Sequence, residues 1–251
     1  MTSTPTRPPL RSFDGRRVVV VGGSSGIGNG IARCFLEAGA DVVVTGTRTS
    51  ANDYSGVDGA DLDALGYVRL DVTDSAGFAA LPWGDGLDVL VNSPGIVAYQ
   101  RREYDPEVFA RVVDVNLTGV MRCCVHYHNA LASRGGSVVN VGSTSSFIST
   151  PGQPGYSASK GGVLTLTRSL ADAWAADGIR VNGIAPGFVA TRLTAVTRER
   201  DSTYEATLRS IPLGRWGTPA EMGSVALFLA SPMASYVTGQ MLLVDGGMTL
   251  R

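Results

Sequence analysis

The sequence predicts a single α/β domain, a doubly wound seven-stranded parallel sheet flanked by helices. Short valine-rich runs alternate with longer helical patterns along the chain, and no shift in composition divides it. The short runs are apolar without alternation, which is typical of strands buried on both faces by crossover helices. The strands are expected at 18–21, 42–45, 68–70, 89–91, 138–141, 181–184 and 242–244.

Helices are expected between the strands, where apolar residues recur with helical spacing, at 27–38, 106–131, 156–177 and 219–229. Gly39 and Gly178 act as helix stops. Two segments interrupt the pattern. Residues 46–65 are rich in Ser, Asn, Asp and Gly and are expected to form a loop. Residues 190–219 mix apolar and charged residues after a Pro-Gly turn, and we expect them to leave the sheet as a substrate lid.

Residues 15–251 are expected to form the domain, and residues 1–14, dominated by Thr, Pro and Arg, a flexible N-terminal tail. The 251-residue chain is 44% hydrophobic, which suffices for a substantial core. No run approaches the roughly twenty apolar residues that a bilayer crossing needs, and no apolar secretory signal is seen. We therefore expect a soluble protein with no membrane partner.

Charge and cysteine content narrow the class further. Twenty-one basic and 22 acidic residues give a net charge of −1 with no basic stripe, so nucleic acid is not an expected partner. Cys34, Cys123 and Cys124 are an odd number in apolar helical settings, which predicts reduced thiols and a cytoplasmic location. Cys123 and Cys124 lie near His126 and His128, but structural zinc needs four converging ligands, so no metal is expected.

A glycine-rich turn follows the first predicted strand and opens the first helix, in the order Val-Gly-Gly-Ser-Ser-Gly-Ile-Gly. Glycine lets the backbone approach a pyrophosphate, and the helix N-terminus supplies unpaired amide donors. The turn predicts a dinucleotide-binding (Rossmann) domain, and a tight turn without a ligand is the alternative. The expected contacts are Gly22, Ser24, Ser25, Gly26, Ile27 and Gly28.

The end of the second predicted strand bears on the choice of dinucleotide. Enzymes that prefer NAD place an acid there for the ribose 2′-hydroxyl, whereas this chain has Thr45, Gly46, Thr47 and Arg48. Thr47 and Arg48 are suited to a 2′-phosphate, so NADP is favoured and NAD is the alternative. The alternative is that Arg48 is a solvated side chain in a loop with no part in binding.

Tyr156 and Lys160 project from one face of a predicted helix because they are four residues apart. A free phenol has a pKa of about 10, and a fixed ammonium beside it favours the phenolate. Tyr156 is therefore a candidate general acid/base. On its own, such a pair is more often a solvated surface pair.

Together these features resemble the short-chain dehydrogenase/reductase family along nearly all of residues 15–251. Asn116 in Val-Asn-Leu-Thr-Gly matches the family's helical asparagine, and Ser143, thirteen residues before Tyr156, matches its substrate-binding serine. The resemblance implies hydride transfer at nicotinamide C4, with Ser143 and Tyr156 polarising the substrate oxygen. It also implies that Tyr156 exchanges the proton, Lys160 lowers the pKa of Tyr156 and holds the ribose hydroxyls, and Asn116 positions a proton-relaying water.

The resemblance also extends the cofactor contacts. The Pro186-Gly187 turn and Thr191 match the segment that holds the nicotinamide carboxamide, and Asp71 matches the adenine contact. The remaining expected contacts are Val72, Asn92, Gly95, Tyr156, Lys160 and Val189. In Asn92-Ser93-Pro94-Gly95 the family more often has Asn-Asn-Ala-Gly, and proline lacks an amide donor, so contacts at 93 and 94 are not carried over.

Residues 211–221 look like the 3-oxoacyl-carrier-protein reductase type, which is commonly a homotetramer. The helices beginning at Pro106 and Tyr156 are apolar over more than one face, which also favours a homotetramer. The expected function is NADP-dependent reduction of a small-molecule ketone, or oxidation of the secondary alcohol. Two alternatives stay open: an NAD-linked dehydrogenase of a sugar, polyol or steroid alcohol, and a regulator that binds a dinucleotide but catalyses no reaction. The substrate pocket is expected to be lined by Val97, Ser145, Phe147, Phe188 and the lid.

Overall fold

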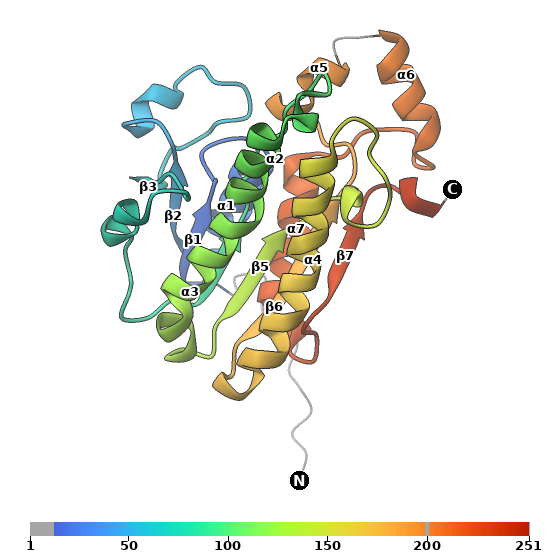
Figure 1. The fold of residues 1–251 in the computed structure, drawn as a ribbon. Helices are drawn as coiled ribbons and strands as arrows, with labels where there is room; N and C mark the ends of the chain where they lie inside the picture. The colour runs from blue at the N-terminus through green and yellow to red at the C-terminus, as the bar shows by residue number, and fades with distance from the viewer. Residues whose placement is uncertain (1–12, 199–200, 251) are drawn as a thin grey trace.

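The computed structural model describes residues 13–198 and 201–250 and has a seven-stranded, fully parallel sheet in the order β3-β2-β1-β4-β5-β6-β7 (Figure 1). The order reverses between β1 and β4, and α/β sheets bind ligands at such a switch point. The predicted fold class is confirmed. The strands are β1 Arg17–Val21, β2 Asp41–Gly46, β3 Gly66–Arg69, β4 Val89–Asn92, β5 Ser137–Val141, β6 Arg180–Pro186 and β7 Met241–Val244.

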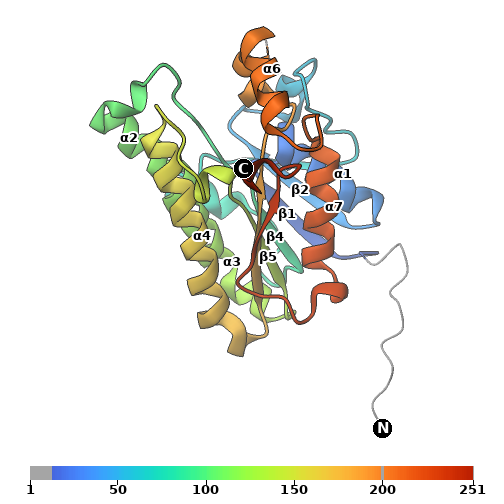
Figure 2. The ribbon, with the colours of Figure 1, turned by 90° about the vertical axis from the view of Figure 1, so that its right-hand side faces the viewer.

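Helices cover both faces of the sheet (Figure 2). On one face α1 packs on α7, and on the other α2, α3 and α4 lie together. The short α5 and α6 project beyond the end of the sheet (Figure 1). The helices are α1 Gly26–Glu37, α2 Pro106–Val113, α3 Gly119–Ala132, α4 Pro154–Trp174, α5 Ala195–Arg198, α6 Asp201–Ser210 and α7 Pro219–Ala230.

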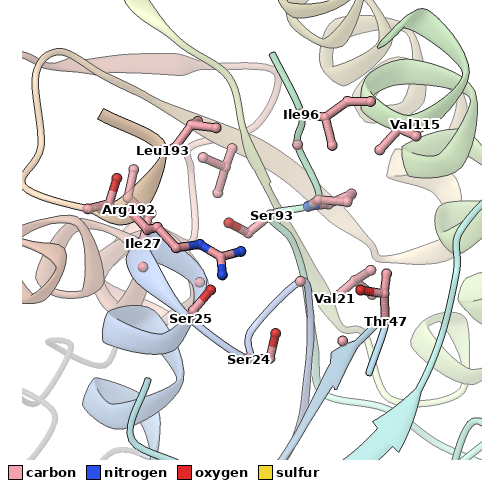
Figure 3. Close-up of a pocket in the computed structure, with 18 of the residues that line it drawn as sticks. Val21, Ser24, Ser25, Ile27, Thr47, Ser93, Ile96, Val115, Arg192 and Leu193 are labelled. Carbon is pink, nitrogen blue, oxygen red and sulfur yellow. The ribbon is translucent and has the colours of Figure 1, made fainter. Parts of the chain in front are cut away.

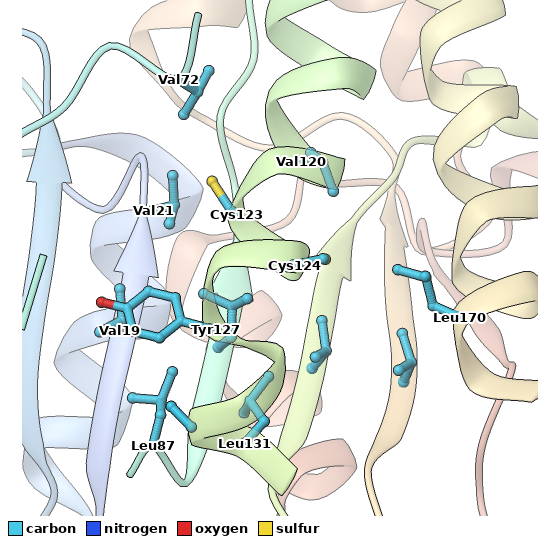
Figure 4. Close-up of a cluster of buried hydrophobic side chains, with 14 of the residues drawn as sticks. Val19, Val21, Val72, Leu87, Val120, Cys123, Cys124, Tyr127, Leu131 and Leu170 are labelled. Atoms are coloured by element: carbon cyan, nitrogen blue, oxygen red, sulfur yellow. The ribbon is translucent and has the colours of Figure 1, made fainter. Parts of the chain in front are cut away.

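Each face of the sheet has its own hydrophobic core. Ile31 and Phe35 of α1 and Leu229 of α7 pack on one face. On the other, Tyr127 and Leu131 of α3 are fully buried against the central strands (Figure 4). The continuous valine runs of the strands supply apolar side chains to both cores, which is why these strands show no polar alternation.

Three segments differ from the prediction in detail. The expected helix 106–131 is interrupted by a π-helical turn, Asp114–Thr118, and the expected loop 46–65 contains a 3-10 turn, Ala51–Tyr54. The predicted tail 1–14 lies outside the described residues up to residue 12. Phe13 belongs to the fold, because it is 4% exposed and packs edge-on against Phe35, with ring centroids 5.0 Å apart.

Candidate active site

A cavity of about 550 Å³ lies where the strand order reverses (Figure 3). Its walls come from the segments that follow β1, β2, β3, β4, β5 and β6 and from the first turns of α4. Each of these segments continues from the carboxyl end of its strand, so the parallel sheet brings them together. Residues from widely separated parts of the sequence therefore line one cavity.

The glycine-rich turn lines the cavity, and Gly22, Gly23 and Gly28 cannot be replaced without collision. A Cβ on Gly22 would lie 2.8 Å from the Ser93 carbonyl oxygen, and Gly22 has a φ of +71°. A Cβ on Gly28 would collide with the Gly22 carbonyl. Ser25, the residue before α1, makes no side-chain capping hydrogen bond, and the first turn of α1 has no acidic residue. The Gly26 amide already donates to the Gly59 carbonyl at 2.8 Å, so the amides of Ile27 and Gly28 are the ones in this turn that are available to an anion.

Tyr156, Ser143 and Lys160 all line the cavity, with the Tyr156 phenol hydrogen-bonded to the Ser143 side chain. The Ser143 hydroxyl oxygen also accepts the Ser145 amide at 3.1 Å. The Lys160 ammonium donates to the Val141 carbonyl at 2.8 Å and lies 5.8 Å from the centre of the Tyr156 ring. The structure thus groups a phenol, a hydroxyl and an ammonium in one cavity, as a proton-transfer site requires.

The pKa of Tyr156 is raised in the protein, whereas the sequence predicts that Lys160 lowers it. Burial raises it, the hydrogen bond from Ser143 lowers it, and nearby Tyr99 and Glu103 raise it, so the net direction is upward rather than the predicted depression. Burial also lowers the pKa of Lys160 to about 8. The Lys160 ammonium donates its hydrogen bond to the Val141 carbonyl instead of the phenol, and its charge does not offset the rise in the Tyr156 pKa that burial causes. The protein by itself therefore keeps Tyr156 protonated near neutral pH.

Asn116 lies in the π-helical turn and is fully buried. Its Oδ1 accepts the Ile96 amide at 2.8 Å, and its Nδ2 donates to the Ile96 carbonyl at 2.9 Å and to Ser159 Oγ at 3.1 Å. Asn116 does not line the cavity. Its contacts fasten the segment after β4 to α4, which carries Tyr156.

The other predicted contacts line the cavity with one exception. Asn92 is fully buried in β4 instead, where its Nδ2 donates to Asn140 Oδ1 at 2.9 Å and to Cys124 Sγ at 3.2 Å. Its side chain points toward Cys124 of α3 and Asn140 of β5, away from the cavity. The contacts placed in the cavity are Gly22, Ser24, Ser25, Gly26, Ile27, Gly28, Thr47, Arg48, Asp71, Val72, Gly95, Tyr156, Lys160, Pro186, Gly187, Val189 and Thr191.

Four residues expected to line the substrate pocket do not line the cavity, whereas residues of the expected lid do. Phe188 stacks on Trp216 with ring centroids 5.1 Å apart, and the Ser145 hydroxyl pairs with that of Thr150 at 2.7 Å. Val97 and Phe147 are also outside the lining. Phe147 lies close in sequence to Ser143, and Phe188 to the Pro-Gly turn, but closeness in sequence does not fix the direction of a side chain.

Several lining residues were missed by sequence reasoning. Tyr99 lines the cavity and donates its hydroxyl to the Leu193 carbonyl at 2.7 Å, which joins the segment after β4 to residues 190–219. Arg192 reaches into the cavity over the glycine-rich turn (Figure 3). The signal for Arg192 was its position directly after Thr191. Nothing in the sequence pattern singled out Tyr99 or Tyr54, which also lines the cavity.

The cysteines and histidines of α3 do not converge. Cys123 and Cys124 are buried free thiols, and burial raises the pKa of Cys124 to about 12. His128 Nε2 lies 2.9 Å from the Asp177 carboxylate, and His126 packs against Phe78. Within residues 13–198 and 201–250, no three His, Cys, Asp or Glu side chains are grouped as metal ligands. No helix in that part of the chain is long and apolar enough to span a bilayer.

Comparison with known proteins gives matches over nearly the whole chain. A family model described as enoyl-(acyl carrier protein) reductase matches residues 21–249. The chain is 39% identical to a 3-oxoacyl-[acyl-carrier-protein] reductase of Chlamydia pneumoniae, with 94% of this chain and 97% of the relative covered. It is 41% identical to a galactitol 2-dehydrogenase (L-tagatose-forming) of Cereibacter sphaeroides, with 95% and 96% covered.

Solved structures agree. The fold matches a putative 2-deoxy-D-gluconate 3-dehydrogenase from Agrobacterium tumefaciens with bound NADP, at a TM-score of 0.86 and 35% identity. That match covers 98% of this chain and 100% of the other. Sequence and fold thus point to one group of proteins, whose named members act on different substrates.

Proposed function

Because the chain belongs to the short-chain dehydrogenase/reductase family, it is an NAD(P)-dependent oxidoreductase, and we propose that Tyr156 serves as its general acid in the reduction of a ketone by NADPH. The reverse reaction oxidises the secondary alcohol. The observation that carries the proposal is the Tyr156 phenol, hydrogen-bonded to Ser143 inside the cavity that the glycine-rich turn closes.

The residues of the cavity fit a dinucleotide. A Cβ would collide with neighbouring atoms at Gly22, Gly23 and Gly28, so these positions leave the backbone bare and able to approach a pyrophosphate closely. The amides of Ile27 and Gly28 lie in the first turn of α1, at the positive end of its dipole, and favour negative charge. Asp71 and Val72 lie on the lining after β3, where an adenine would lie.

NADP is favoured over NAD by the charge at the end of β2. The cavity wall there contains Thr47 and Arg48 and no carboxylate. A guanidinium forms paired hydrogen bonds to phosphate oxygens, whereas a carboxylate would repel them. The structural relative from Agrobacterium tumefaciens contains NADP, which supports the same choice.

The side chains divide the chemistry among them. When bound, the nicotinamide supplies the hydride. Ser143 and Tyr156 donate hydrogen bonds to the carbonyl oxygen of the substrate, and Tyr156 gives up its proton as negative charge develops there. The raised pKa of Tyr156 keeps the proton on the phenol until negative charge develops on the substrate oxygen. Lys160 stabilises the phenolate that remains and holds the ribose hydroxyls, and Asn116 fixes the segment that frames them.

Three further features of the proposal concern the molecule as a whole. Residues 190–219 serve as the substrate lid, since Leu193 and Val196 line the cavity and Tyr99 fastens this segment from the opposite wall. A homotetramer is proposed from the apolar faces of the helices, with Met121 and Val125 of α3 exposed in the single chain. A cytoplasmic location is proposed from the free thiols.

The test is the Tyr156→Phe variant, assayed for NADPH consumption with a panel of 3-oxoacyl thioesters, keto sugars and cyclic ketones. Turnover is expected to fall by roughly 10²- to 10⁴-fold, the contribution of general acid catalysis, while NADPH binding is retained. Tyr104→Phe is the matched control, because Tyr104 is 66% exposed and outside the cavity. Unchanged turnover in Tyr156→Phe would refute the assigned role.

A further inference from the structure

The geometry points to Tyr54 as the residue that sets the dinucleotide preference, by excluding a side chain at position 46 and by holding the Arg48 guanidinium beside the cavity. The inference rests on the proposed dinucleotide site. Tyr54 ends the 3-10 turn Ala51–Tyr54 in the segment after β2, and its side chain lines the cavity.

Position 46 has no space for a side chain. A Cβ on Gly46 would collide with the Tyr54 hydroxyl, and it would lie 2.6 Å from Ser24 Oγ and 2.8 Å from Ser24 Cβ. Gly46 is the last residue of β2, where NAD-preferring enzymes place the acid that binds the ribose 2′-hydroxyl. Tyr54 and Ser24 together therefore keep an acid out of this place.

The Tyr54 side chain is fixed and cannot swing away. It is 6% exposed, and its ring packs against that of Tyr67 with centroids 5.7 Å apart. Its hydroxyl accepts the Arg48 amide at 3.3 Å and is hydrogen-bonded to the side chains of Ser24 and Thr47. Burial alone would raise the pKa of this phenol, but its hydrogen bonds outweigh burial and the pKa is lowered. A hydroxyl with this many partners is costly to displace.

The same ring positions Arg48. The Arg48 guanidinium carbon lies 4.8 Å from the centre of the Tyr54 ring, and its Nη1 donates to the Asp53 carbonyl. The Arg48 backbone is held at both ends of the residue, since Tyr67 also donates its hydroxyl to the Arg48 carbonyl at 2.6 Å. A guanidinium restrained in this way loses less conformational freedom when it meets a phosphate.

The turn that carries Tyr54 is itself fixed. Ser50 and Asp53 form a reciprocal capping box, in which the Ser50 amide donates to Asp53 Oδ2 at 2.9 Å. The segment that lacks helical periodicity in the sequence thus places one aromatic ring with defined contacts on both sides. These contacts show that Arg48 is not simply a solvated side chain in a loop.

The experiment is a fluorescence titration with NADPH and NADH of the wild type, Tyr54→Leu, Tyr54→Phe and Arg48→Gln. Tyr54→Leu is expected to weaken NADPH binding at least two- to fivefold, the effect of losing a cation–π contact of roughly 0.5–1 kcal/mol, and to leave NADH binding unchanged. Tyr54→Phe keeps the ring and should retain NADPH binding. Tyr54→Leu should have no further effect in the Arg48→Gln background, because the contact is already lost.

Two outcomes would overturn the inference. If Tyr54→Leu weakens both dinucleotides equally, Tyr54 has only a structural role. If Gly46→Asp binds NADH more tightly than the wild type does, position 46 can accept an acid and Tyr54 does not exclude it. Failure of the proposed function is distinguishable, because the wild type would then bind neither dinucleotide.

Discussion

Lys160 is a buried cation whose removal should change how stability depends on pH. Its side chain is 3% exposed, and its ammonium donates a hydrogen bond to the Val141 carbonyl at 2.8 Å. Burial lowers its pKa from 10.5 to about 8. We predict that Lys160→Met removes a pH-dependent cost that the wild type carries.

The magnitude follows from the difference between 10.5 and about 8, at about 1.36 kcal/mol per pH unit, which gives roughly 3 kcal/mol. Below about pH 8 the folded and unfolded chains both hold the proton, and the full cost of the buried ammonium is present. Between about pH 8 and 10.5 the unfolded state binds more protons at Lys160, so stability rises with pH. Above that window both states are neutral and the cost is gone.

Urea unfolding of the wild type and Lys160→Met at several pH values between about 7 and 10.5 measures this directly. Contributions from titrating groups remote from Lys160 cancel in the difference between the two proteins, and carrying out the comparison in the Tyr156→Phe background removes the contribution of the neighbouring phenol. The wild type should gain about 3 kcal/mol on the variant across the window. A difference that stays constant across the window would refute the reasoning, because Lys160 would then titrate alike in both states.

Three further predictions concern other parts of the molecule. Asn116→Ala removes the hydrogen-bond partners of the Ile96 amide and carbonyl, so it should lower the free energy of unfolding, measured in urea, by about 2–4 kcal/mol. An unchanged free energy of unfolding would contradict the role of Asn116 in fastening the segment after β4 to α4. Arg192→Gln should weaken NADPH and NADH binding by the same factor, roughly tenfold, because both share the pyrophosphate; a loss confined to NADPH would contradict this. The Arg215 hydrogen bond lowers the pKa of Glu221 to about 2, so its small contribution, below about 1 kcal/mol, should be present above about pH 4 and be lost as the pH falls toward 2. Glu221→Gln should unfold with less acid dependence over that range.

The fold was predictable because its strongest signals are local. Apolar runs such as 18–21 and 89–91 lack the alternation of apolar and polar residues that a strand with one solvated face shows. The structure pairs these two strands in parallel register at the centre of the sheet. The glycine-rich turn was predictable for a related reason. Gly22, Gly23 and Gly28 have no room for a Cβ, and Gly26 has a φ of +60°, which favours glycine.

What could not be predicted depends on contacts between distant segments. Tyr54 lies in a stretch without helical or strand periodicity, and its importance comes from Ser24 and Arg48, which fold back against it. The raised pKa of Tyr156 depends on burial and on the buried carboxylate of Glu103, neither of which the Tyr-x-x-x-Lys spacing reveals. Spacing indicates which groups share a helix face, but not how dry their surroundings are.

Asn92 is a residue that the sequence predicts to contact the cofactor but that the structure places away from the cavity. A residue at the end of a strand that faces a ligand cleft is a reasonable contact, but successive side chains of a strand point to opposite faces of the sheet. Asn92 points toward Cys124 and Asn140, away from the cavity. Only the placement of α3 over that face determines the outcome.

The central claim, a dinucleotide site that prefers NADP, is tested most directly by a fluorescence titration of the purified wild type with NADPH and with NADH. The measurement requires no knowledge of the substrate. The account predicts that both bind and that NADPH binds more tightly, because Arg48 meets the 2′-phosphate. Tighter binding of NADH would contradict the assignment of NADP, and binding of neither would contradict the dinucleotide site itself.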